Sequence, residues 1–119
     1  MNRQIIELVE RHCDTLRVEF AAVEDAFAEL GRGAETGALD RLVAATHKIK
    51  GSSGTLGFAE ISARAARYEH ALRDAVAAAP FGSDPHAFRA LHDGLARAVA
   101  EIHPAQSTLH ARFSQTGTG

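Results

Sequence analysis

The sequence has one cysteine, Cys13, and no run of apolar residues long enough to cross a membrane. A single cysteine cannot form a disulfide within the chain, so a reducing compartment is expected. A membrane-spanning helix needs about 18 or more consecutive apolar residues. Residues 1–4 lead directly into an amphipathic pattern instead of an apolar signal peptide. These absences predict a cytoplasmic protein without a membrane segment.

The chain also has little net charge and no second block of distinct composition. Its formal net charge of -2 gives no field that would attract nucleic acid or an anionic membrane. A length of 119 residues is the size of one domain. We expect a single domain over residues 1–113, followed by a disordered tail over 114–119 with nothing to bury.

Lysine is rare, and its placement is uneven. The chain has 13 basic residues, of which only Lys48 and Lys50 are lysines, and both lie beside His47. Lysine acts on phosphate as a compact point charge. The pair therefore suggests neutralisation of an anion next to His47, although a general preference for arginine explains the same count.

No segment alternates between apolar and polar residues with period two, so no strand is expected. Apolar residues instead recur every three or four positions, which predicts amphipathic helices. The expected helices run to residue 30, from 38 to about 57, from 59 to before Pro80, and from Pro85 after an Asp84 N-cap to Ile102. Pro104 should end or kink the last one. Long helices with short loops predict an all-α, antiparallel four-helix bundle.

Gly51 and Gly54 stand inside the second expected helix, shortly after His47. A glycine there costs roughly 1 kcal/mol relative to alanine, a loss tolerated where another backbone must approach closely. Gly51 follows His47 by four residues and Ala44 precedes it by three, so small residues surround the imidazole on one helix face. The pattern predicts a prominent histidine on a flat surface, with Lys50 beside it.

Other interpretations of this segment have less support. A metal site lacks histidine pairs at i,i+3 or i,i+4 spacing, and a Walker A loop needs its lysine after the glycines, whereas Lys50 precedes them. Ser52 and Ser53 have no third group in the sequence to orient a catalytic triad. The ordinary interpretation of a lone histidine is a surface residue, and we expect it for His12, His86, His92, His103 and His110.

The segment His47 to Phe58, HKIKGSSGTLGF, closely resembles the signature of histidine-containing phosphotransfer (HPt) domains. It is most similar to the N-terminal phosphotransfer domain of chemotaxis histidine kinases. The resemblance implies a helical bundle in which His47 is phosphorylated, Lys50 neutralises the phosphoryl group with help from Lys48, and Gly51 admits a partner. It also implies that Glu69 orients the imidazole. Ala66 stands where chemotaxis domains carry a further histidine, which leaves that part of their network open.

The resemblance predicts a phosphorelay carrier in a bacterial-type two-component system, working between aspartate receiver domains. Its expected partners are response-regulator receivers and a hybrid or chemotaxis-type histidine kinase, and the protein is expected to be a monomer. It should need no cofactor of its own, since the receiver would supply Mg²⁺, and it should lack an ATP-binding kinase region. A binding module that regulates a kinase or receiver without being phosphorylated is the alternative, and a metal-dependent helical hydrolase is a third. The residues expected to dock a partner are Ala44, Gly51, Gly54, Arg64 and Arg67.

Overall fold

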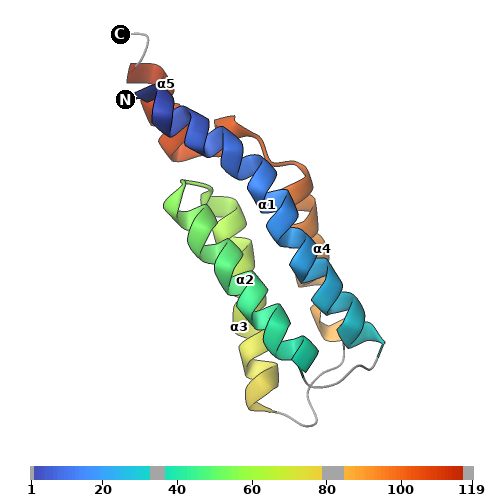
Figure 1. Cartoon of the computed structure of the whole chain (residues 1–119). Coiled ribbons are helices and arrows are strands. Elements are labelled where there is room, and N and C mark those ends of the chain that lie inside the picture. Colours follow the sequence, from blue (N-terminus) through green and yellow to red (C-terminus); the bar gives the residue numbers. More distant parts are fainter. Residues whose placement is uncertain (1, 33–36, 79–84, 117–119) are drawn as a thin grey trace.

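The computed structural model describes residues 2–32, 37–78 and 85–116, and every regular element in these ranges is helical (Figure 1). This confirms the all-α fold expected from the sequence. A short fifth helix follows the four that were expected. In chain order the elements are α1 (Asn2–Gly31), α2 (Gly37–Thr55), α3 (Ala59–Ala77), the 3₁₀ turn η1 (Pro85–Phe88), α4 (Arg89–Ala100), the 3₁₀ turn η2 (Pro104–Gln106) and α5 (Thr108–Thr116).

Helix α1 runs along most of the molecule, which measures 57 × 20 × 20 Å (Figure 1). It packs against α2 on one side and against α4 and α5 on the other. Its apolar stripe is buried as the spacing predicts, with Val9, Leu16 and Val23 fully covered. Helices α2 and α3 form an antiparallel hairpin whose inner face contributes Leu42, Ile49 and other side chains to the same core.

The turn between α2 and α3 is held against the segment that precedes α5. Gly57 has a φ of +86°, which favours glycine, and a Cβ atom there would lie 2.8 Å from the backbone nitrogen of Leu109. The Thr108 amide donates a hydrogen bond to the Gly57 carbonyl at 3.0 Å, and the Ser107 hydroxyl donates one to the Leu56 carbonyl at 2.6 Å. These contacts fix the end of the α2–α3 hairpin.

The end of the chain differs from the simplest expectation. Helix α4 ends at Ala100, and Pro104 opens η2, so proline ends the helix instead of kinking it. The Ser107 hydroxyl then accepts the His110 amide at 3.0 Å, in the manner of an N-cap, and α5 begins. Helix α5 continues through residues 114–116, which were expected to be disordered, while 117–119 and the expected N-cap Asp84 lie outside the described residues.

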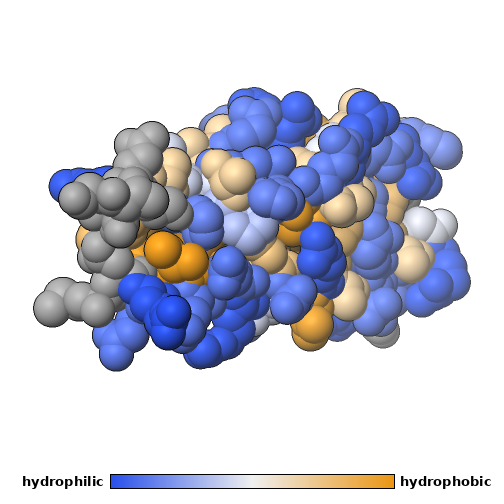
Figure 2. Space-filling model, turned by 90° about the horizontal axis from the view of Figure 1, so that it is seen from above, coloured by the Kyte–Doolittle hydropathy of each residue, from blue (hydrophilic) through white to orange (hydrophobic). Residues whose placement is uncertain are grey.

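The surface is mostly polar. On the face shown in Figure 2, hydrophilic residues cover most of the area and apolar residues form small separate patches. The exposed large apolar side chains include Leu8 and Val18 on α1 and Val76 on α3. Scattered apolar residues of this kind are ordinary for a protein surface.

The expectation that His12 and His92 lie on the surface was wrong, because both are buried. Each occupies the apolar stripe of its helix: His12 lies four residues before the fully buried Leu16, and His92 three residues before the fully buried Leu95. Burial lowers the pKa of both histidines, because it penalises the charged imidazolium.

His92 on α4 is enclosed by side chains from α1 and α3. Its Nδ1 atom lies 2.9 Å from the Tyr68 hydroxyl oxygen, and its Nε2 lies 3.3 Å from a carboxylate oxygen of Glu24. Its ring stacks on Phe27 with centroids 4.0 Å apart. Both nitrogens and one ring face are therefore occupied inside the core.

Candidate functional site

His47 projects from the solvent-facing side of α2. Its side chain is 59% exposed, whereas Thr46 and Ile49 on either side of it are fully buried. Ala44 and Gly51, one helical turn away in each direction, are also exposed. A Cβ atom added to Gly51 would meet nothing within 4 Å, so this glycine serves no packing contact inside the protein. The imidazole thus stands on an open surface of small residues.

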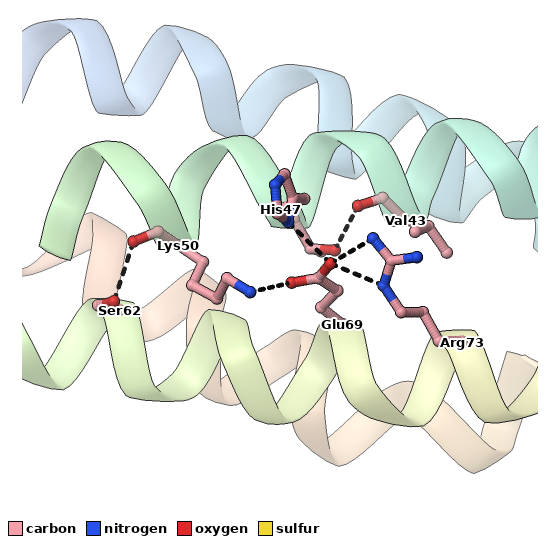
Figure 3. Close-up of polar contacts among 7 residues, drawn as sticks. Val43, His47, Lys50, Ser62, Glu69 and Arg73 are labelled. Carbon is pink, nitrogen blue, oxygen red and sulfur yellow. Dashed lines mark hydrogen bonds and ion pairs between the residues drawn. The ribbon is translucent and has the colours of Figure 1, made fainter.

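Glu69 reaches His47 from α3. Its Oε2 atom lies 2.9 Å from His47 Nδ1, and its side chain is only 4% exposed (Figure 3). An ionised carboxylate can only accept hydrogen bonds, so Nδ1 carries the proton in this contact. A neutral imidazole held in this way has its lone pair on Nε2.

Two cations hold the Glu69 carboxylate. Lys50 Nζ forms an ion pair with Oε1 at 2.9 Å, while Arg73 contacts Oε2 through Nε at 2.8 Å and Nη2 at 2.7 Å (Figure 3). Burial by itself would raise the pKa of Glu69, but the interactions with Lys50, Arg73 and His47 outweigh it and lower the pKa to about 2. Glu69 is therefore ionised at neutral pH.

Small residues allow α2 and α3 to approach closely at the site. The Ser62 hydroxyl on α3 donates a hydrogen bond to the Lys50 carbonyl on α2 at 2.9 Å (Figure 3). A Cβ atom on Gly54 would come within 3.1 Å of that same hydroxyl oxygen. Gly54 therefore lies against the neighbouring helix, unlike Gly51, and its small size serves the helix contact.

Three other predicted site residues, Lys48 for the phosphoryl group and Arg64 and Arg67 for docking, do not join the Glu69 cluster. Lys48 forms an ion pair with Glu19 on α1 at 3.6 Å. Arg64 pairs with Glu60 at 2.8 Å and lines a groove of about 330 Å³ between α3 and α4, away from α2. Arg67 is exposed and precedes Glu69 by two residues, which places it on a different face of α3.

Arg73 is the member of the cluster that the sequence interpretation missed. It follows Glu69 by four residues, the spacing at which helix side chains meet. That spacing was visible in the sequence, but one such pair is ordinary on any helix. Only the burial of Glu69 between α2 and α3 makes this one unusual.

Within residues 2–32, 37–78 and 85–116, no three histidine, cysteine, aspartate or glutamate side chains gather closely enough to hold a metal ion. None of the helices in these ranges is long and apolar enough to span a bilayer.

Comparison with known proteins identifies one family. The model of the Hpt domain family matches residues 7–101, which is well over half of the chain. The matched segment includes Glu69 together with its partners His47, Lys50 and Arg73. No curated protein and no solved structure matches the chain.

Proposed function

The chain belongs to the Hpt domain family and has that family's histidine phosphotransfer role, and from this membership we propose that His47 carries the phosphoryl group between the aspartates of receiver domains. The observation that supports this best is the contact between His47 Nδ1 and Glu69. It leaves Nε2 as the nucleophilic atom of an exposed imidazole. Lys50 and Gly51 would help a phosphoryl donor to reach that atom.

The proposed step requires little from the carrier itself. The Nε2 lone pair of His47 forms a bond to phosphorus while the bond from phosphorus to the donor aspartate oxygen breaks, and its electron pair leaves with the carboxylate. The Nδ1 proton stays hydrogen-bonded to Glu69, which balances the positive charge that develops on the ring. Positioning and charge neutralisation account for most of the catalysis in phosphoryl transfer.

Lys50 and Gly51 have separate parts in this proposal. Lys50 supplies a positive charge from α2 at the same carboxylate that contacts the imidazole, and Gly51 leaves space for the receiver's active site to approach. We expect the receiver to bring the Mg²⁺ and the aspartate. Ala44 extends the same open surface, whereas the positions of Arg64 and Arg67 do not place them beside His47.

The test is transfer of radiolabelled phosphate from a phosphorylated receiver domain to the full chain. We expect acid-labile label on the protein and complete loss of label in His47→Gln. His70→Gln is the matched control, because His70 is exposed on the neighbouring helix α3 and forms an ion pair with Asp74 there. This control should accept label like the unchanged protein.

The same assay separates the carrier from a module that only docks. A protein that binds the phosphorylated receiver but gains no label at His47 would support the docking module and overturn the carrier. Full labelling of His47→Gln would place the phosphoryl group on another residue and would equally overturn the proposal.

A further inference from the structure

The Glu69 carboxylate is a buried anion with two cationic partners. Its side chain is 4% exposed, and the two cations bind different oxygens, Lys50 on Oε1 and Arg73 on Oε2. Figure 3 shows them approaching the carboxylate from opposite sides, with His47 next to Oε2. One buried carboxylate thus has one cation from the histidine's own helix α2 and another from α3.

This arrangement creates a conflict for Lys50. If Lys50 is to neutralise a phosphoryl group on His47, its ammonium must leave or share Glu69 Oε1. A buried carboxylate that loses its only counter-ion pays a large desolvation penalty, so Lys50 would be held back if it stood alone. Arg73 removes that obstacle, because it stays bound to Oε2 through two nitrogens.

We propose that Arg73 is a resident counter-ion of Glu69, which frees Lys50 to move from the carboxylate to the phosphoryl group on His47. The inference rests on the proposed function of His47. Arg73 acts here as a positioning residue, because it works through Glu69 and Lys50. Lysine suits the mobile role as a point charge on a flexible stem, whereas the planar guanidinium suits the fixed one.

The geometry of Arg73 fits this assignment. Its side chain lies four residues after Glu69 on the same helix, so its position does not depend on how α2 moves against α3. Its Nε and Nη2 atoms both contact Oε2, which holds the guanidinium in one orientation. His47 Nδ1 shares that oxygen, so Arg73 also keeps the hydrogen-bond acceptor of the imidazole in place.

The experiment is a double-mutant cycle with phosphoramidate as the donor, which needs no receiver surface. We expect Lys50→Ala, Glu69→Gln and Arg73→Gln each to slow labelling of the full chain by about 10-fold, and the Glu69→Gln/Arg73→Gln double variant also by about 10-fold, because Arg73 acts only through the Glu69 carboxylate. Additive loss, about 100-fold in the double variant, would overturn the inference. An unchanged rate in Arg73→Gln would do the same.

Two controls separate positioning from a general loss of structure. Arg89→Gln removes an arginine of the same exposure, 58%, from an i,i+4 ion pair on α4 and should label normally. Arg73→Lys keeps the charge and should recover part of the rate. A carboxyl carbon NMR titration should show the pKa of Glu69 rising in Arg73→Gln and not in Arg89→Gln, and an unchanged titration would contradict the counter-ion role.

The outcomes for the two proposals are distinct. If the unchanged protein takes no label from phosphoramidate or from a phosphorylated receiver, the carrier function itself fails. If it takes label on His47 and the cycle is additive, the carrier function stands and only the role of Arg73 fails. Thermal melts of each variant show whether a slow rate reflects unfolded protein.

Discussion

Two histidines of this protein take hydrogen-bond partners from adjacent residues of α3, yet their surroundings are opposite. His92 Nδ1 lies 2.9 Å from the Tyr68 hydroxyl oxygen and His47 Nδ1 lies 2.9 Å from Glu69. The His92 side chain is 4% exposed, and its second nitrogen faces Glu24. The His47 side chain is 59% exposed, and its Nε2 is the atom turned away from the Glu69 contact.

The comparison shows what a carrier histidine requires beyond a partner for one nitrogen. Both rings are oriented by α3, so orientation alone does not distinguish them. Tyr68 is a neutral partner inside the core, whereas Glu69 is an ionised one that can balance charge on the ring. A fixed tautomer, a charged acceptor and an accessible second nitrogen occur together at His47, while His92 serves the packing of α1, α3 and α4.

The largest effect should come from removing the core ring. His92→Ala leaves a cavity beside Phe27 and an unpaired Tyr68 hydroxyl, so we expect the free energy of unfolding to fall by about 4 kcal/mol. Equilibrium urea unfolding measures this change. The folded fraction should still accept label on His47. A folded His92→Ala protein that cannot be labelled would contradict the view that His92 serves packing and His47 serves phosphotransfer.

The second largest effect should be the loss of the stabilising contacts of Glu69 in acid. The pKa of Glu69 is lowered from its ordinary value of 4.5 to about 2, so its contribution to stability is full above pH 4.5 and is lost as the pH falls towards 2. The shift corresponds to about 3 kcal/mol. The stability of the unchanged protein should therefore fall more steeply across this range than that of Glu69→Gln. Parallel curves from urea unfolding at each pH would contradict the assignment.

The core histidine should respond to pH in a different window. Burial lowers the pKa of His92 below its ordinary value of 6.5, although Glu24 on α1 opposes the shift. Because the unfolded chain takes up this proton more readily, stability should fall as the pH drops below 6.5. His92→Gln should reduce that fall, with buried His12 retaining a part of it. The Tyr68 side chain packs against His92, and the charges of Arg89 and Asp93 act on its pKa. If His92→Gln changes the free energy of unfolding by the same amount at every pH, the change comes from such contacts and not from protonation of His92.

The smallest effect should distinguish the two glycines of α2. Gly51→Ala adds a methyl group in open space and should stabilise the protein by up to about 1 kcal/mol. Gly54→Ala should gain less or lose stability, because its Cβ would lie 3.1 Å from the Ser62 hydroxyl. Thermal melts compare the two variants directly.

A larger side chain at position 51 should affect transfer more than folding. Gly51→Gln is expected to fold, to accept label from phosphoramidate, and to lose transfer from a phosphorylated receiver, because the added bulk obstructs docking. Equal loss with both donors would mean that the side chain covers His47 itself. An unfolded protein would favour a packing role for Gly51.

The sequence predicts the helices and the central residues of the site well, for physical reasons. Apolar spacing defined α1, α2 and α3 to within a few residues because each helix buries one continuous stripe. The geometry brings His47, Lys50 and Glu69 together, as the resemblance implied. Their roles in phosphotransfer stay predictions.

The features missed from the sequence depend on how separate helices meet. His12 and His92 lie at apolar-stripe positions, and this was a usable signal, but a polar side chain there is buried only if partners such as Tyr68 and Phe27 come from other helices. The placement of Lys48 beside Glu19 likewise follows from the packing of α2 against α1. Pattern along one helix says little about such contacts.

The hydrogen bonds from Ser107 and Thr108 to the α2–α3 turn affect where this domain can be truncated. The family match stops at residue 101, whereas Ser107 and Thr108 bind the carbonyls of Leu56 and Gly57. A protein shortened to the matched residues would release the tip of the hairpin that carries His47 and uncover the part of α1 that α5 packs against. We therefore expect the stably folded domain to extend beyond the residues that match the family, and fusions of this domain to other proteins should include α5.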